Sequence, residues 1–343
     1  MKSEDEVEFL KKLFLIISIF VFTLALTGCG KYNASKIVKE LSNDIKNIDA
    51  YYLQGTMDIY NNEDVYSYDV KVSYQKDDNY RVSLTNQLNN HEQIILRNNE
   101  GVYVLTPSLN KSFKFQSQWP YNNSQIYLLQ SIIDDLSNED EIEFKESNDR
   151  YILISDVNYP NNSNLEEQIV YIDKNFNIKQ VDIIDDNEIV QMKMTFDTID
   201  KKATFNDNYF DLNENLSSAS VNTEKSNTVS KIEDVIYPMY LPTGTYLQSQ
   251  STVSKSDGER VIMTFEGDNA FTLIQETVSM TDQNLVVSVN GDPEILADTV
   301  GVIDENSVSW ISNGIEYYIV SENMSSNEML TVAKSISAIP VSK

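Results

Sequence analysis

The sequence has one cysteine and one histidine, and its acidic residues outnumber its lysines and arginines two to one. The 343 residues carry 53 acidic and 26 basic side chains, a formal net charge of −27. Because the cysteine is Cys29, no disulfide and no cysteine nucleophile can lie after it. A charge this negative argues against nucleic acid and anionic membrane surfaces as direct ligands. Beyond Cys29, no apolar run reaches the roughly 20 residues that a membrane-spanning helix needs.

Catalytic signatures are also scarce. His91 lies among Asn89, Asn90 and Glu92 at an expected turn, so we predict a surface residue. No Gly-x-Ser-x-Gly segment accompanies it, which argues against serine hydrolase chemistry. Among 53 acids some carboxylate pair could always be nominated, so a cell-wall hydrolase stays open as a third hypothesis. We expect no enzyme activity, no metal and no cofactor.

The N-terminal stretch predicts export. Lys11-Lys12 precedes an apolar run from Leu13 to Leu26, and Thr27-Gly28-Cys29 follows. The run is too short to span a bilayer but fits the apolar region of a secretory signal. Its end resembles the lipobox of bacterial lipoproteins, in which the cysteine thiol takes a diacylglycerol and the signal is cut just before it. The resemblance implies that Cys29 is the first mature residue and a membrane tether.

Two alternatives to the tether remain, an ordinary cleaved signal and an uncleaved anchor. The acidic start, with Glu4, Asp5, Glu6 and Glu8 ahead of the lysines, departs from a basic signal and suggests that translation starts further in. The lipobox interpretation survives this departure. It places the protein on the extracytoplasmic face of the cell membrane.

Hydrophobic periodicity divides the rest of the chain into parts. Residues 35–48 have helical spacing of apolar side chains, and a second helix is expected at about 123–136 with Ser124 as its cap. Period-two alternation predicts short antiparallel strands at 66–74, 80–85, 92–97, 102–106, 112–115, 141–145, 150–157, 166–173, 177–184 and 188–198. After a polar, aperiodic stretch, further strands are expected at 245–253, 259–266, 269–277, 284–289, 299–303, 307–312 and 315–321, and a closing helix with the capping box Ser325 to Glu328 follows. The expected parts are a signal peptide (1–28), a tether (29–34), a half-barrel domain (35–212), a linker (213–232) and a small α+β domain (233–343).

The predicted fold class is α+β and mainly β. A dozen short antiparallel strands with two helices indicate a curved sheet or open barrel, with the helices on its concave side.

Three segments resemble the LolA/LolB-like lipoprotein carriers, in particular their Gram-positive members linked to sporulation or germination. They are Phe113 to Leu129 with its Trp-Pro step, Glu100 to Pro107, and Tyr171 to Asn177. The resemblance covers roughly residues 31–212. Tyr240 to Pro242, Trp310 to Tyr318 and Ala333 to Ile336 of the C-terminal region resemble an uncharacterised domain of Firmicute surface and sporulation proteins. The family implies a cup-shaped sheet that can hold acyl chains, although this chain departs from soluble carriers in being anchored and in having an extra domain.

Trp119, Pro120 and Tyr121 are the candidate lip of a lipid-binding cup or of a partner-binding patch. The alternative is that Trp119 packs in the core and Pro120 sets the turn. A calcium loop at Asp173, Asn175 and Asn177 lacks the glycine and glutamate that such loops need, so a plain hairpin turn is the stronger interpretation.

Two functional hypotheses follow. The favoured one is a lipid-anchored, non-catalytic protein that binds an acyl ligand or a partner in spore-envelope assembly or germination. The other is a scaffold whose cup is filled by its own side chains and which holds a cell-wall enzyme at the membrane. By analogy with clostridial germination lipoproteins, a cortex-modifying amidase is the candidate client.

Overall fold

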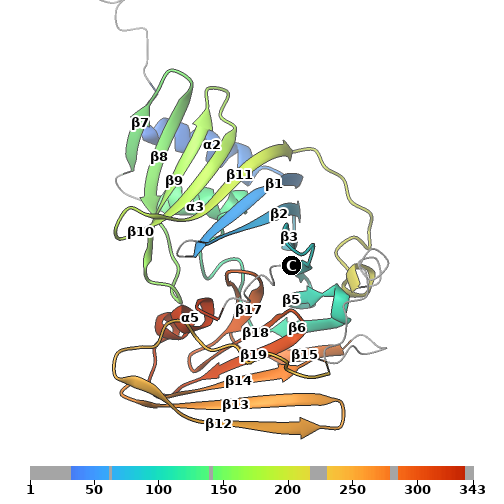
Figure 1. The fold of residues 1–343 in the computed structure, drawn as a ribbon. Helices are drawn as coiled ribbons and strands as arrows, with labels where there is room; N and C mark the ends of the chain where they lie inside the picture. The colour runs from blue at the N-terminus through green and yellow to red at the C-terminus, as the bar shows by residue number, and fades with distance from the viewer. Residues whose placement is uncertain (1–31, 62–63, 139–141, 217–229, 279–284, 337–343) are drawn as a thin grey trace, which may run out of the picture.

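Two large β-sheets form the molecule and lie one above the other in Figure 1. The computed structural model describes residues 32–61, 64–138, 142–216, 230–278 and 285–336. The predicted signal peptide and Cys29 lie outside the described residues. Within them, no helix is long and apolar enough to cross a membrane.

The first sheet has twelve strands in the order β15-β6-β5-β4-β3-β2-β1-β11-β10-β9-β8-β7. It is curved and open, which confirms the predicted fold class. Its strands from the N-terminal part of the chain are β1 (Ala50–Asn61), β2 (Asp64–Gln75), β3 (Asn79–Asn86), β4 (Glu92–Asn98), β5 (Gly101–Thr106), β6 (Lys111–Phe115), β7 (Glu143–Glu146), β8 (Arg150–Asp156), β9 (Leu165–Asp173), β10 (Ile178–Asp185) and β11 (Val190–Asp200). A short 3₁₀ helix, η1 (Pro107–Leu109), links β5 to β6.

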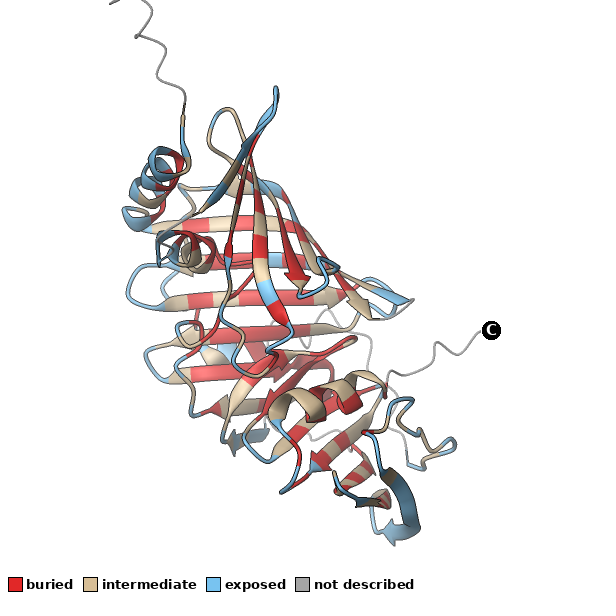
Figure 2. Ribbon diagram, turned by 90° about the vertical axis from the view of Figure 1, so that its left-hand side faces the viewer, coloured by how far each residue is buried: buried red, intermediate tan, exposed pale blue. Residues whose placement is uncertain are grey.

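Helices α2 (Ala34–Lys46) and α3 (Leu129–Asn138) lie against the concave face of this sheet, with their polar sides outward (Figure 2). The predicted apolar stripe of the first helix is buried, namely Ile37, Val38, Leu41 and Ile45. Its start is capped by Asn33, whose side chain accepts a hydrogen bond from the Lys36 amide at 2.9 Å. The predicted position of the helices inside the curve is thereby confirmed.

The second sheet has seven strands in the order β12-β13-β14-β19-β18-β17-β16. Helix α5 (Ser326–Lys334) packs on it, and its predicted capping box is present because Ser325 and Glu328 bond each other's backbone amides. The strands are β12 (Thr245–Lys255), β13 (Gly258–Gly267), β14 (Phe271–Thr277), β16 (Asp292–Ile295), β17 (Val300–Ile303), β18 (Ser307–Ser312) and β19 (Ile315–Val320).

The second predicted helix begins later than expected. Its apolar face is buried as predicted, but α3 starts at Leu129, and Ser124 does not cap it. The Ser124 amide donates to the Asn158 carbonyl at 2.8 Å, and the Gln125 amide donates to the Ser131 hydroxyl at 2.7 Å. These local polar bonds compete with helical ones, so residues 123–128 cross the concave face as an irregular segment.

Strand β15 (Leu285–Val289) joins the two parts of the chain. It pairs in parallel with β6, from Leu285 opposite Lys111 to Val289 opposite Phe115. The predicted C-terminal domain therefore contributes a strand to the sheet of the predicted half-barrel. The start of the predicted linker is also packed, since Asn215 and Leu216 are buried and the side chain of Asn215 accepts a hydrogen bond from Arg81 at 2.6 Å.

Several side chains fasten the two sheets together. Gln93 of β4 accepts bonds from the Thr299 hydroxyl at 2.9 Å and the Val300 amide at 2.7 Å. Lys111 forms an ion pair with Glu316 at 2.8 Å, and both side chains are largely buried. Val300 and Val302 belong to the core of the first sheet. Because apolar contacts, hydrogen bonds and a shared sheet all cross the junction, the space between the sheets is preformed.

Candidate functional site

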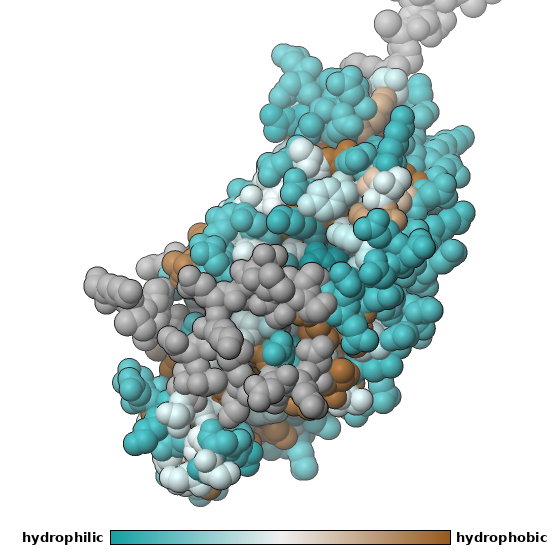
Figure 3. All heavy atoms as spheres, turned by 90° about the vertical axis from the view of Figure 1, so that its right-hand side faces the viewer, coloured by the Kyte–Doolittle hydropathy of each residue, from teal (hydrophilic) through white to brown (hydrophobic). Residues whose placement is uncertain are grey.

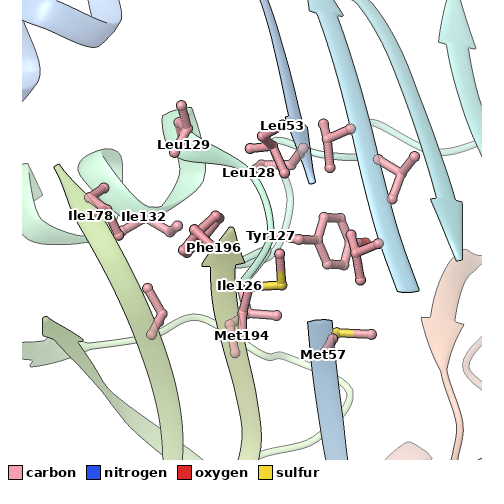
Figure 4. Packing of buried hydrophobic residues seen from close by; sticks show 14 of the residues in the cluster. Leu53, Met57, Ile126, Tyr127, Leu128, Leu129, Ile132, Ile178, Met194 and Phe196 are labelled. Atoms are coloured by element: carbon pink, nitrogen blue, oxygen red, sulfur yellow. The ribbon is translucent and has the colours of Figure 1, made fainter. Parts of the chain in front are cut away.

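The concave face of the first sheet, where a carrier would hold an acyl chain, is packed with the protein's own side chains. Figure 4 shows Tyr127, Leu128, Leu129 and Ile132 reaching from the crossing segment and α3 toward Leu53 and Phe196 of the sheet. Each residue of this plug is at most 3% exposed, and its members are Trp119, Ile126, Tyr127, Leu128, Leu129, Ile132 and Ile133. The plug and the helices fill the cup.

A hydrogen-bond network holds the plug in place. The Ser124 hydroxyl donates to Asp135 at 3.0 Å and accepts from the Asn158 amide at 2.8 Å. The Tyr127 hydroxyl donates to Gln125 at 2.5 Å. Burial raises the pKa of Asp135 to about 7, with Ser124 opposing the shift. Because these polar side chains bond one another, they can be buried in the crossing segment at little cost.

An open pocket lies between the two sheets, below the plug. Its volume is about 350 Å³, and its walls come from the ends of β1 and β10, the crossing segment, the β8–β9 connection, β16 and α5. Amide and tyrosine side chains dominate its polar lining: Tyr60, Asn61, Asn123, Gln125, Tyr159, Asn162, Asn164, Gln191 and Tyr240. Asn61 fixes one wall, because its side chain donates to the Lys334 carbonyl at the end of α5 at 2.9 Å.

Glu294 of β16 and Lys334 of α5 place opposite charges in this pocket. Burial raises the pKa of Glu294 to about 7, against the opposing effect of Lys334. Burial likewise lowers the pKa of Lys334, and the Glu294 carboxylate opposes that shift. In the described part of the chain the two groups form no ion pair within 4.0 Å, although each lies in the other's electrostatic field. The pocket therefore presents two separated and incompletely solvated charges.

With this geometry in view, comparison with known proteins decides the family. A family model described as sporulation protein YdcC-like matches residues 10–210. The sporulation protein YdcC of Bacillus subtilis is 34% identical over 327 residues, which is 95% of this chain and 97% of that protein. The chain belongs to the YdcC-like sporulation family. The predicted kinship with Gram-positive sporulation proteins is thereby confirmed.

Solved structures with a similar fold are distant. They include the MucA/MucB complex of Pseudomonas aeruginosa (14% identical, 88% of this chain and 97% of that chain, TM-score 0.32). A LolA superfamily protein of Nitrosomonas europaea is 10% identical over 54% of this chain and all of that one, with a TM-score of 0.30. The CwlD amidase of Clostridioides difficile with the GerS lipoprotein is 13% identical over 51% and 98%, with a TM-score of 0.22. At these TM-scores the similarity carries no functional argument.

The candidate lip of this YdcC-like chain is mostly buried. Trp119 is 0% exposed and packs edge-on against Tyr80, and Pro120 beside it is also buried. Tyr121 is 54% exposed, carries Arg97 over its ring and donates to Asp78 at 2.6 Å. Of the three residues, Tyr121 alone presents a large exposed surface to a ligand or partner.

The calcium loop and the histidine considered in the sequence analysis both have structural roles. Asp173 accepts bonds from the amides of Asn175 and Asn177 at 2.8 and 2.9 Å, so this segment is the expected hairpin turn. His91 is half-buried rather than on the surface as predicted, because Ser108 of η1 packs beside it at 3.4 Å. Burial lowers the pKa of His91.

Sequence reasoning missed the pocket and its two charges. The pocket combines segments that are far apart in the chain, as the separation of Asn61 and Lys334 by 273 positions shows. Glu294 lies on β16, which the sequence analysis did not predict as a strand. The sequence signal for a buried Glu294 was its position between the apolar residues Pro293 and Ile295. This pattern is also common in strands with one face in water, so it does not single out a buried carboxylate.

The buried state of Glu294 predicts a pH dependence of stability. The folded protein keeps its proton up to about pH 7, whereas the unfolded chain releases it near its ordinary pKa of about 4.3. Glu294 should therefore make the free energy of unfolding fall as pH rises from about 4.5 to 7, by up to about 3.5 kcal/mol at 1.36 kcal/mol per pKa unit. Asp135, whose pKa burial also raises to about 7, adds a fall over the same range. Urea unfolding at pH 5 and pH 8 measures this fall.

Glu294→Gln keeps the shape of the side chain and removes its charge, so the part of this fall that Glu294 contributes should vanish, whereas the part from Asp135 should remain. Glu305→Gln, at an exposed turn, is the matched control and should change the pH dependence little. Equal pH dependence in the wild-type and Glu294→Gln proteins would show that Glu294 is not the group responsible.

Proposed function

We propose that this protein is a non-catalytic, membrane-tethered binding protein of the sporulating cell, held outside the membrane by a diacylglyceryl group on Cys29. Its ligand enters the pocket between the sheets, and its cup carries no acyl chain. The observation behind this proposal is the plug, which occupies the concave face with side chains that are almost fully buried.

The lining of the pocket supports a polar ligand. An acyl chain needs an apolar lining, because burying amide and charged groups against hydrocarbon leaves them without hydrogen bonds. The pocket mixes apolar side chains, among them Ile59, Met192 and Leu330, with amide side chains, tyrosines and the charges of Glu294 and Lys334. Small-ligand sites of this kind use a few convergent polar groups to fix orientation and specificity.

The location of His91 supports binding rather than catalysis. It lies beside Ser108, and neither residue lines the pocket. A general base must come within hydrogen-bond reach of the bound molecule. The histidine is therefore outside the site that the ligand would occupy.

Native mass spectrometry tests the absence of an acyl ligand. The chain with Cys29→Ser is incubated with membrane lipid extract, and we expect the mass of the protein alone because an acyl chain would have to displace the plug. Leu88→Asp is a control for surface adhesion, since Leu88 is 71% exposed in the turn between β3 and β4. A lipid retained one-to-one by both proteins would overturn the proposal.

A second candidate function is the scaffold hypothesis, and strand β12 favours it. This strand pairs with β13 on one side, and no described strand pairs with its other side. Ten of its eleven residues are exposed, including Tyr246 and Val253. An open edge of this kind can accept a strand from another protein. A cell-wall amidase as the client stays a prediction from the sequence.

A further inference from the structure

We infer that the pocket between the sheets receives a small zwitterion, an amino acid or the end of a short peptide, through Glu294 and Lys334. The inference rests on the proposed function, which assigns the pocket as the ligand site. Glu294 would accept the ligand's ammonium group, and Lys334 would donate to its carboxylate.

The first observation is the state of Glu294. Its side chain is 8% exposed and lines the pocket. Within the described residues it has no ion pair, and no hydrogen bond to its carboxylate occurs there. Buried carboxylates are normally paired or hydrogen-bonded, so this one has unused capacity for a donor.

The second observation is that Lys334 faces the same space from a different element. Both side chains line the pocket, and among the described residues they form no ion pair within 4.0 Å of each other. Two opposite charges that face one cavity without pairing suit a molecule that carries both charges. Such a molecule satisfies both side chains at once, whereas a simple cation or anion satisfies only one.

The remaining charged groups near the pocket favour a ligand with an ammonium group. Asp185 lines its rim, and Asp292 lies on the same strand as Glu294. The chain as a whole carries a net charge of −27, which opposes entry of a ligand that is only anionic. Figure 3 shows that hydrophilic side chains cover most of the described surface on the face it draws.

Amide side chains around the charges suit a peptide bond. Asn162 is almost fully buried and lines the pocket together with Gln191 and Asn164. An amide side chain offers both a donor and an acceptor, which matches the N–H and C=O of a ligand backbone. The volume of about 350 Å³ lies at the small end of the range for ligand pockets, roughly 300–1,000 Å³. A single amino acid or a dipeptide fits this description better than a long chain.

Calorimetric titration of the Cys29→Ser chain tests the inference. The probes at pH 7.5 are alanylalanine, its N-acetyl derivative and its C-terminal amide. We expect the free dipeptide to bind and each capped form to bind at least about tenfold more weakly, because each cap removes one charge.

Two variants should lose one preference each. Glu294→Gln should bind the free and the N-acetylated dipeptide equally while still preferring the free carboxylate. Lys334→Met should bind the free acid and the amide equally while still preferring the free amine. Glu305→Gln, outside the pocket, should keep both preferences. This crossed pattern cannot come from misfolding, which would weaken all probes together.

The outcomes separate this inference from the function on which it rests. The chain could bind N,N′-diacetylchitobiose but not the dipeptide, with neither Glu294→Gln nor Lys334→Met changing dipeptide binding. The pocket would then be a ligand site, but its ligand would not be a zwitterion. If neither probe binds, the inference is also overturned. If the lipid experiment finds a stoichiometric acyl ligand in the cup, the proposed function itself fails.

Discussion

Cys29→Ser is expected to release the protein from the membrane fraction. The serine hydroxyl cannot take the diacylglyceryl group, so the variant lacks both acyl chains. Each CH₂ group of a chain buried in the membrane contributes about 0.8 kcal/mol to binding, and even one chain alone holds a protein only marginally. Cell fractionation with metabolic labelling by an alkyne fatty acid measures both location and lipid. The wild-type chain should carry the label in the membrane fraction, and the variant should carry none.

Gly28→Ala is the matched control, because it keeps a small residue before the cysteine and should retain both label and location. A wild-type chain without label would contradict the lipobox interpretation. An unlabelled Cys29→Ser chain that stays in the membrane would instead show that the apolar run from Leu13 to Leu26 anchors the protein uncleaved.

Trp119→Ala is expected to lower the free energy of unfolding by about 3–5 kcal/mol, the usual cost of removing a buried aromatic side chain. Trp119 has no exposed surface, and the centroid of its ring lies 6.0 Å from that of the Tyr80 ring. Its backbone is also fixed, because its carbonyl accepts a bond from Arg97 at 2.5 Å and its amide donates to Ser117 at 2.9 Å. The rigid surroundings leave little room for collapse around the cavity. Equilibrium unfolding in urea gives the difference.

Tyr121→Ala provides the comparison for this prediction. Its side chain is more than half exposed, so its loss should cost roughly 1 kcal/mol, mainly through the hydrogen bond to Asp78. Similar losses for the two variants would contradict the assignment of Trp119 to the core. If Tyr121→Ala instead abolished binding of a partner while leaving stability intact, the surface half of the predicted lip would be functional.

Much of the fold could be predicted because its elements are half-buried. In such elements one face contacts the core and the other contacts water, so apolar and polar residues alternate along the sequence with the period of the helix or strand. The buried side of α2 and the capping box of α5 were visible for this reason. Strand β1 was overlooked although its exposed and buried positions alternate along most of its length.

The remainder depended on contacts between distant segments. Ile126 has the spacing of a helical residue, but hydrogen bonds of Ser124 and Gln125 to other segments keep the chain around it irregular. Gly55 shows the same effect, because β1 shifts its register against β11 there and an added Cβ would lie 2.1 Å from the Thr195 carbonyl oxygen. The pairing of β15 with β6 has no local signature. The pocket inherits this difficulty, since each of its walls comes from another part of the chain.

The parallel pairing of β15 with β6 makes the two halves inseparable as building blocks. A fragment that ends before β15 would expose the edge of β6 and leave Gln93 and Lys111 without their partners, and an open strand edge invites association with other chains. Replacing the C-terminal half with another module would therefore break these contacts, which is not the case in proteins whose domains meet only through a linker.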